Sequence, residues 1–275
     1  MGDIGVNALS NCKFIKSIIL SDGLTEIGRD AFRHCLNLEN IVIPESVTKI
    51  DPYAFAWSGL KSIILPHGLT EIGGRAFYCC RNLETVVIPE TVAKIGKYAF
   101  ADSGLKSIAL PHGLTEIGEN VFHYCYNLET VVIPKSVTKI GPYAFAWSGL
   151  KSIILPHGLT EIGERAFEEC NNLETVIIPK TVTKIGSNTF AQSGLKSIIL
   201  PHQLTEIEKY TFYLCCDLET VVIPETITKI GPKAFACSGL RSIILPYGVK
   251  ISEDAFYGCH NLVVKYIKYP QDILQ

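Results

Sequence analysis

The sequence lacks several features that would place it in a familiar functional class. No apolar run reaches the roughly 18 residues that crossing a bilayer requires. Lys and Arg number 25 and Asp and Glu 27, for a formal net charge of −2, and no block of like charge occurs. There is no CxxC pair, no HExxH motif, no phosphate-binding glycine loop and no nucleophile elbow. We therefore expect no membrane insertion, no nucleic-acid partner, no metal, no cofactor and no catalytic residues.

The chain also lacks a linker and a recognisable leader. No Gly/Ser-rich or proline-rich spacer divides it, which predicts a single domain over residues 1–275. Its start, MGDIGVNALSNCKF, has neither the basic patch nor the apolar stretch of a secretory signal. Two interpretations stay open: a protein that remains inside the cell, or a chain that begins after a removed leader.

Phenylalanine supplies the strongest pattern that is present. Eleven of these residues recur at gaps that alternate between 23 and 22 positions, apart from a last gap of 21: Phe32, Phe55, Phe77, Phe100, Phe122, Phe145, Phe167, Phe190, Phe212, Phe235 and Phe256. A strict period of this size is typical of a solenoid, in which each repeat buries an apolar face only against its neighbours. The pattern predicts stacked coils with a column of phenylalanine rings inside.

One repeat indicates how a coil is built. Alternation predicts a strand at residues 62–65 with Ile63 and Leu65 inward, and Pro66, which has no N–H, ends it. Leu69 and Ile72 are expected to turn inward through an irregular arc, before Ala76 and Phe77 return beneath the sheet. Stacking such coils produces a parallel sheet.

The same residues resemble a known family of repeats. The segments IPKSVTKIGPYAFAWSGLKSIILP at 133–156 and AFEECNNLETVIIP at 166–179 resemble the BspA-like, or treponemal-type, leucine-rich repeat, and the resemblance spans about residues 8–265. It implies an α/β solenoid: a right-handed superhelix with a parallel β-sheet on one face and short turns or 3-10 segments on the other. The repeat period itself predicts about twelve coils, with a partial N-terminal coil or cap at 1–20 and a C-terminal cap at 261–275, where the pattern ends.

The outward positions of the predicted strands are the candidate partner-binding residues. They form an apolar column flanked by Ser and Thr: Ile64, Val87, Ala109, Val132, Ile154, Ile177, Ile199, Val222 and Ile244. Contiguous exposed apolar patches often mark interfaces. The alternative is that β-branched residues suit strands and pair across them without a partner. A glutamate at Ile154 is expected to leave the fold intact and to weaken any association of this surface.

Other repeated residue types have structural interpretations. Cysteines in every second coil would lie about 10 Å apart, beyond the ~7 Å limit for a disulfide, so a buried row of thiols is predicted. Cys79, Cys216 and Cys237 break this pattern and could approach neighbours such as Cys215 or Cys259. Histidines every 45 residues and alternating Lys/Glu stripes are predicted to be surface rows. Aromatic residues near the turns are either binding anchors or packing: Trp57, Trp147, Tyr53, Tyr98 and Tyr143.

Two functional hypotheses follow. Members of the resembled family are typically surface or secreted adhesins, which implies a non-enzymatic protein-binding or cell-adhesion module that presents its sheet to a protein or glycan. The alternative is an intracellular scaffold or a structural protein that associates with itself through an exposed end. It rests on the lack of a recognisable leader and on the thiols that are predicted to stay unpaired.

Overall fold

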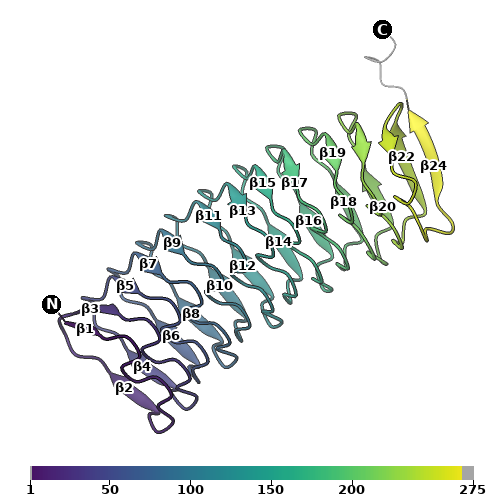
Figure 1. Ribbon diagram of the computed structural model, residues 1–275. Coiled ribbons are helices and arrows are strands. Elements are labelled where there is room, and N and C mark those ends of the chain that lie inside the picture. The colour runs from purple at the N-terminus through teal and green to yellow at the C-terminus, as the bar shows by residue number, and fades with distance from the viewer. Residues whose placement is uncertain (1, 268–275) are drawn as a thin grey trace. The chain divides into compact units, whose positions relative to one another are not determined.

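The computed structural model describes residues 2–267, which fall into two compact units: unit 1 ends at Val137 and unit 2 begins at Thr138 (Figure 1). In each unit the chain winds in successive coils, and the coils contribute strands to two series. Paired strands run parallel, so residues about one repeat apart lie side by side. Each unit is a parallel-strand solenoid, as the phenylalanine period predicted.

Unit 1 contains strands β1 to β12. The first series comprises β2 Ser17–Ile19, β4 Asn40–Val42, β6 Ser62–Ile64, β8 Thr85–Val87, β10 Ser107–Ala109 and β12 Thr130–Val132. These strands pair two by two, as β2–β4, β6–β8 and β10–β12. The second series comprises β1 Gly2–Ile4, β3 Leu24–Ile27, β5 Lys49–Ile50, β7 Glu71–Ile72, β9 Lys94–Ile95 and β11 Glu116–Ile117. Its first five strands form one sheet in the order β1-β3-β5-β7-β9.

Unit 2 repeats the arrangement with strands β13 to β24. The first series comprises β14 Ser152–Ile154, β16 Thr175–Ile177, β18 Ser197–Ile199, β20 Thr220–Val222, β22 Ser242–Pro246 and β24 Val263–Ile267, again paired two by two. The second series comprises β13 Lys139–Ile140, β15 Glu161–Ile162, β17 Lys184–Ile185, β19 Glu206–Ile207, β21 Lys229–Ile230 and β23 Lys250–Ile251. Within this unit, β13-β15-β17 and β19-β21-β23 each form a run of parallel neighbours.

The first series follows from the alternation of residue types. In β6 the side chain of Ile63 is 3% exposed, whereas Ser62 and Ile64 face outward. The exposed–buried–exposed order is the same in β4, β8, β10 and β12 of unit 1 and in β14, β16, β18 and β20 of unit 2. Because side chains of a strand point alternately to the two faces, the local sequence is enough to fix this orientation.

Two parts of the predicted fold are wrong. Residues 2–267 contain no helix, so neither the α/β class nor a 3-10 face is present. It follows that this part of the chain has no helix that could span a membrane. The arc expected to be irregular contains β7, whose Glu71 and Ile72 pair with residues of β5 and β9. A strand of two residues depends on main-chain partners 22 or 23 positions away, which the local pattern does not reveal.

The third side of each coil is a turn centred on its phenylalanine, here called the phenylalanine turn; around Phe55 it covers residues 52–58. The residues two before and two after the ring have positive φ, 60° at Tyr53 and 58° at Trp57. Every second N–H therefore points to the next coil, from Tyr53 to the carbonyl of Gly74, from Phe55 to that of Ala76 and from Trp57 to that of Tyr78, at 3.1, 2.8 and 2.8 Å. These bonds between coils take the place of helical ones and offset the roughly 1–2 kcal/mol that each left-handed residue costs.

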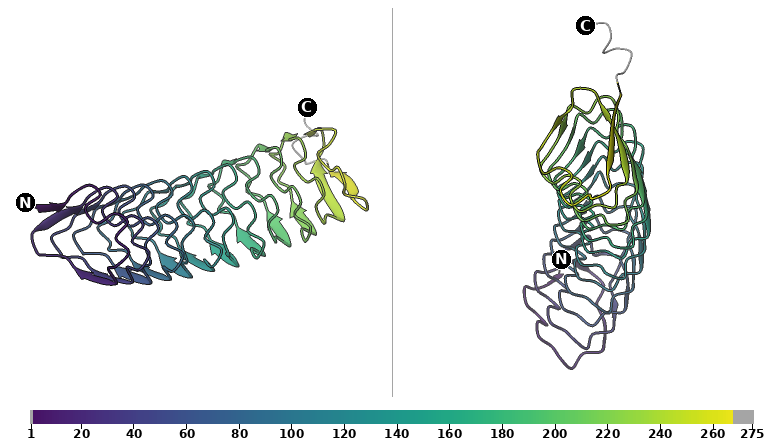
Figure 2. Two further views of the ribbon diagram at one scale, coloured as in Figure 1. Left: turned by 60° about the horizontal axis from the view of Figure 1, so that its bottom comes forward. Right: turned by 90° about the vertical axis from the view of Figure 1, so that its right-hand side faces the viewer.

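The phenylalanine rings form the predicted internal column in each unit. In unit 1, Phe77 stacks on Phe55 and Phe100 at centroid distances of 5.3 and 5.2 Å, with interplanar angles of 8° and 0°. In unit 2, Phe190 stacks on Phe167 and Phe212 at 5.5 and 5.7 Å. All are fully buried. Figure 2 shows from two further directions how, within each unit, the coils lie one upon another.

Coils of two kinds alternate, and their loops differ in length by one residue. Serine coils carry Ser three positions after the Phe, and cysteine coils carry Cys there. Ser62 follows Phe55 by seven positions, whereas Thr85 follows Phe77 by eight. The shorter loop needs glycine, since a Cβ on Gly59 would lie 2.2 Å from the carbonyl oxygen of Leu36 in the preceding cysteine coil.

The predicted end segments lie only partly within the described residues. In the predicted N-terminal partial coil, β1 pairs with β3 and β2 with β4, and residue 1 lies outside the described part. In the predicted C-terminal cap, β24 continues the first series by pairing with β22. Residues 268–275 of that cap lie outside the described part.

Candidate functional site

The apolar column on the first series is exposed in both units. In unit 1, Ile64 is 71% exposed and Val132 65%; in unit 2 the exposure runs from 83% at Ile154 to 53% at Ile244. Val87, Ala109, Ile177, Ile199 and Val222, which the sequence also placed in the column, face solvent as well. Ile19 and Val42 of unit 1 extend the column and were missed, although they occupy the same strand position.

Lys–Glu ion pairs lie beside this column. In unit 1, the Nζ of Lys61 lies 2.7 Å from Glu39 and the Nζ of Lys106 lies 2.7 Å from Glu84. In unit 2, Lys196 pairs with Glu174 at 2.7 Å. Each lysine pairs with the glutamate of the preceding coil, because the coils alternate in charge and lie side by side. The predicted alternation of Lys and Glu in a surface row is thus confirmed at these positions, and the border has little net charge.

Shallow hollows interrupt the column where neighbouring strands belong to different pairs. One of about 390 Å³ lies between β4 and β6, with Val42 and Ile64 among its lining residues. Another of about 300 Å³ lies between β20 and β22, lined in part by Val222 and Ile244. The walls are mainly aliphatic, so these hollows would accept apolar side chains.

A row of histidines and acids follows the strand-ending prolines. Glu45 accepts hydrogen bonds from the backbone N–H of His67 at 2.8 Å and lies 3.2 Å from its Nδ1. Glu90 holds His112 in the same way, at 2.7 Å for both contacts. The backbone N–H, followed by the ring, lowers the pKa of each glutamate. These contacts agree with the predicted surface row, in which each glutamate joins two coils.

The cysteines separate into a buried row and three exceptions. The Sγ of Cys80 donates to the carbonyl of Phe55 at 3.0 Å and lies 3.4 Å from the Oγ of Ser58. Cys170 has equivalent partners in unit 2. Burial raises the pKa of both thiols to about 11, which keeps them protonated donors. The predicted burial is confirmed for five members of the row, Cys35, Cys80, Cys125, Cys170 and Cys215, whereas Cys12 and Cys259 near the ends of the chain are half-buried. The exceptions, Cys79, Cys216 and Cys237, lie after the phenylalanine in their turns or loops.

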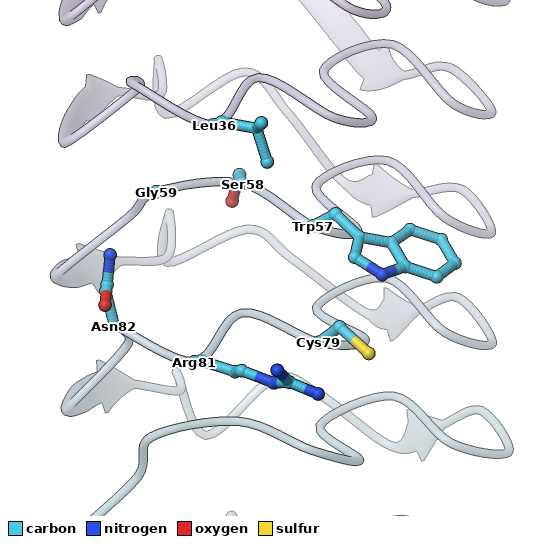
Figure 3. A pocket seen from close by; sticks show the side chains of 7 residues that line it. All are labelled: Leu36, Trp57, Ser58, Gly59, Cys79, Arg81 and Asn82. Carbon is cyan, nitrogen blue, oxygen red and sulfur yellow. The ribbon is translucent and has the colours of Figure 1, made fainter.

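A hollow of about 290 Å³ lies beside the phenylalanine turns of unit 1. Figure 3 shows its lining side chains, with the indole of Trp57 and the thiol of Cys79 on one side and Arg81 and Asn82 below. The hollow exists because the short loop at Gly59 lies between two longer loops. Trp57 stacks on His34 with centroids 4.7 Å apart. Trp57 therefore packs between coils, the second of the two interpretations that its sequence position left open.

The next hollow of unit 1 contains an ion pair. The guanidinium of Arg81 donates to Asp102 through Nη2 at 2.7 Å and through Nε at 3.0 Å, and both residues line a hollow of about 380 Å³. The Sγ of Cys79 donates to the same carboxylate at 3.1 Å. Burial, followed by Asp102, raises the pKa of Cys79 to about 12, so this thiol is a poor nucleophile.

Cationic side chains alternate with tyrosine rings on the other flank of the turns. In unit 1, Arg75 lies 5.4 Å from the ring centroid of Tyr53 and 4.6 Å from that of Tyr98. In unit 2, Arg165 lies 5.5 Å from Tyr143. These contacts were not predicted, although the sequence alternates Tyr and Arg two positions before successive phenylalanines. The tyrosines are thus partners of cations within the solenoid.

No catalytic constellation occurs in the part of the chain that the structure describes. Residues 2–267 contain no group of three His, Cys, Asp or Glu side chains placed to hold a metal ion. The histidines, acids and serines recur in rows, whereas a catalytic site needs a unique convergence of groups.

Comparisons with known proteins agree with this architecture. The model of the BspA type leucine rich repeat region matches residues 1–104, 70–193 and 160–274. A leucine-rich repeat protein from Bacteroides ovatus is 34% identical, with a TM-score of 0.90 over 97% of this chain and 71% of its own. A leucine rich cell surface protein from Faecalibacterium prausnitzii is 28% identical, with a TM-score of 0.57 over 99% of this chain and 78% of its own. No curated protein matches.

The family model covers nearly the whole chain, and the structural match to the Bacteroides ovatus protein extends over almost all of it. The chain therefore belongs to the BspA-type leucine-rich repeat family.

Proposed function

We propose that this protein is a non-enzymatic binding module that presents the first-series strands to a partner protein. The observation that carries the proposal is the apolar column, whose side chains are 53–83% exposed in unit 2. Exposed apolar patches of this continuity are uncommon on monomeric proteins and are typical of interaction sites. The similar cell surface protein from Faecalibacterium prausnitzii supports a role in contacts outside the cell.

The chemistry of the column favours a protein over a glycan. Its members are Ile, Val and one Ala, and no outward residue of strands β4 to β20 is aromatic. Burial of aliphatic surface is favourable against another apolar surface, at about 25 cal/mol per Å². A sugar, covered with hydroxyl groups, has little such surface to offer. The Lys–Glu ion pairs beside the column would add specificity at a polar rim.

Binding of the purified protein to a panel of extracellular-matrix proteins tests this proposal. We expect Ile154→Glu with Ile177→Glu to weaken binding by at least about 30-fold, which corresponds to the roughly 2 kcal/mol of an interface hot spot. Thr183→Glu with Thr205→Glu is the matched control, since it places the same two charges at exposed positions beside β17 and β19 of the second series. The proposal fails if the unmodified protein binds no member of the panel, or if all three proteins bind equally.

A further inference from the structure

Two loop positions in adjacent coils contact each other outside the repeated core. The first position directly follows the Cys of a cysteine coil, and the second lies two residues after the Phe of the next serine coil. In unit 1 these positions hold Arg81 and Asp102, whose side chains meet at 2.7 Å although they are 21 residues apart in sequence. Residues at these two positions are therefore neighbours across the coil boundary.

The chemistry of the two positions is matched from repeat to repeat. Leu36 and Trp57 are both apolar and line one hollow (Figure 3), and Arg81 and Asp102 are oppositely charged. By sequence the matching continues with two amides, Asn171 and Gln192. The inward residues around these positions scarcely change between coils. Variation at two touching positions that preserves their complementarity indicates that each residue suits its neighbour.

In unit 2 the same two positions are occupied by Cys216 and Cys237. The Sγ of Cys216 lies 3.9 Å from the carbonyl oxygen of Cys237, and a Cβ on Gly239 would lie 2.2 Å from the carbonyl oxygen of Cys216. The two loops are thus in contact at this point. Main-chain hydrogen bonds hold the two loops side by side around these cysteines, from Leu214 N–H to the carbonyl of Ala236 and from Gly239 N–H to that of Cys215, both at 3.0 Å.

The two thiols differ in exposure and in the direction that each sulfur faces. Both thiols are free in this structure, Cys216 exposed and Cys237 half-buried. The Sγ of Cys237 now faces Gly258, where a Cβ would lie only 2.8 Å from it. Rotation of the Cys237 side chain about its Cα–Cβ bond would bring the sulfur from the side of Gly258 toward Cys216. No other cysteine of the described residues has a cysteine at its matched position.

We propose that Cys216 and Cys237 form an oxidisable pair that joins two coils of unit 2 through a disulfide. A low-molecular-weight disulfide such as oxidised glutathione is the oxidant. The thiolate of Cys216 attacks one of its sulfurs and releases one thiol, giving a mixed disulfide. The thiolate of Cys237 then attacks the Sγ of Cys216 and releases the second thiol. The two protein thiols are oxidised, one small disulfide is reduced to two thiols, and both protons are accounted for.

Peptide mapping of the full chain after incubation with oxidised glutathione tests the pair. Trypsin cuts after Lys209, Lys229, Lys233 and Arg241, so the two cysteines leave in separate peptides unless they are linked. We expect one cross-linked species that lacks two hydrogen atoms, with fragmentation placing the bond on Cys216 rather than on Cys215. Cys216→Ser and Cys237→Ser should each abolish it, and Cys79→Ser, which removes another exceptional cysteine, should not. A persistent glutathione adduct, a bond to another cysteine or a bond between two chains would each overturn the proposal.

A transplanted ion pair tests the matching of the two positions without any oxidation. Under reducing conditions, Cys216→Arg together with Cys237→Asp places the chemistry of Arg81 and Asp102 at the same site of unit 2. We expect this double variant to unfold at a higher urea concentration than either single variant. If the double variant is no more stable than the less stable single variant, the two positions do not interact and the inference fails.

Discussion

Unit 1 and unit 2 share the same interior and differ in the side chains of their phenylalanine turns and loops. Both bury a stack of phenylalanine rings and a row of thiols. Just after the phenylalanine, however, unit 1 has the half-buried His123 where unit 2 has the buried Glu168. The comparison teaches that stacking constrains the inward residues alone. Other positions of the turns and loops, such as the one directly after the phenylalanine, can then change in charge without changing the coil.

The largest expected effect tests whether the two cores are equivalent. Phe77→Ala in unit 1 and Phe190→Ala in unit 2 should each lower the free energy of unfolding by about 3–5 kcal/mol, measured by urea denaturation. The reason is that each ring is fully buried between two others. Phe14→Ala is the control, because Phe14 is 95% exposed and outside the column; its effect should stay within about 0.5 kcal/mol. A markedly smaller loss in one unit would show that the cores differ.

The next effect concerns the short loops of the serine coils. Gly59→Ala in unit 1 and Gly194→Ala in unit 2 should each destabilise the fold by about 1–3 kcal/mol, since the added methyl group would meet a carbonyl oxygen at 2.2 Å. Gly68→Ala, whose Cβ would lie 3.4 Å from the nearest atom, serves as the control. Equal thermal unfolding midpoints for all three variants would contradict the role given to the close approach of the loops.

The smallest effect is an opposite response of the two units to acid. Burial lowers the pKa of His123 from 6.5 to about 4. Between these values the unfolded chain binds a proton that the fold excludes, so stability falls as the pH decreases through this window. Burial raises the pKa of Glu168 above 4.5, despite Arg165 at 3.5 Å. The contribution of Glu168 to stability therefore has the other sign: the fold gains stability as the pH falls through the raised pKa of Glu168 and loses it as the pH rises through the same range.

Two variants measure these contributions separately. His123→Tyr, which introduces the residue that Tyr78 supplies at the same position, should reduce the loss of stability in acid. Glu168→Gln should remove the gain. Urea midpoints of each variant and of the unmodified protein, compared at the same pH values, cancel the titration of all other groups. Parallel pH curves for variant and unmodified protein would show that these two residues do not titrate as stated.

Much of the fold was predictable because it depends on local alternation and on the repeat period. The strand at Ser62–Ile64, the burial of Cys80 and the outward column all follow from residue type and spacing. The contact of Arg81 with Asp102 was not predicted, although a comparison of the repeats at this 21-residue spacing would have revealed matched pairs. The partner of the column remains a proposal, since a regular scaffold does not specify its ligand.

The sequence by itself determined that the chain winds into coils. It also determined which side chains face inward and which strand positions remain exposed, because these features depend on the 22–23-residue repeat and on the alternation of residue types within each strand. Only the tertiary structure decided that Glu71–Ile72 belongs to a second series of strands and which loop residues meet. It also decided that the turns around the phenylalanines contain residues with left-handed φ and are not helical. The physical reason is that these features arise from main-chain bonds and contacts between adjacent coils. The one-residue difference between serine and cysteine coils sets their register, and local pattern does not reveal which groups that register brings together.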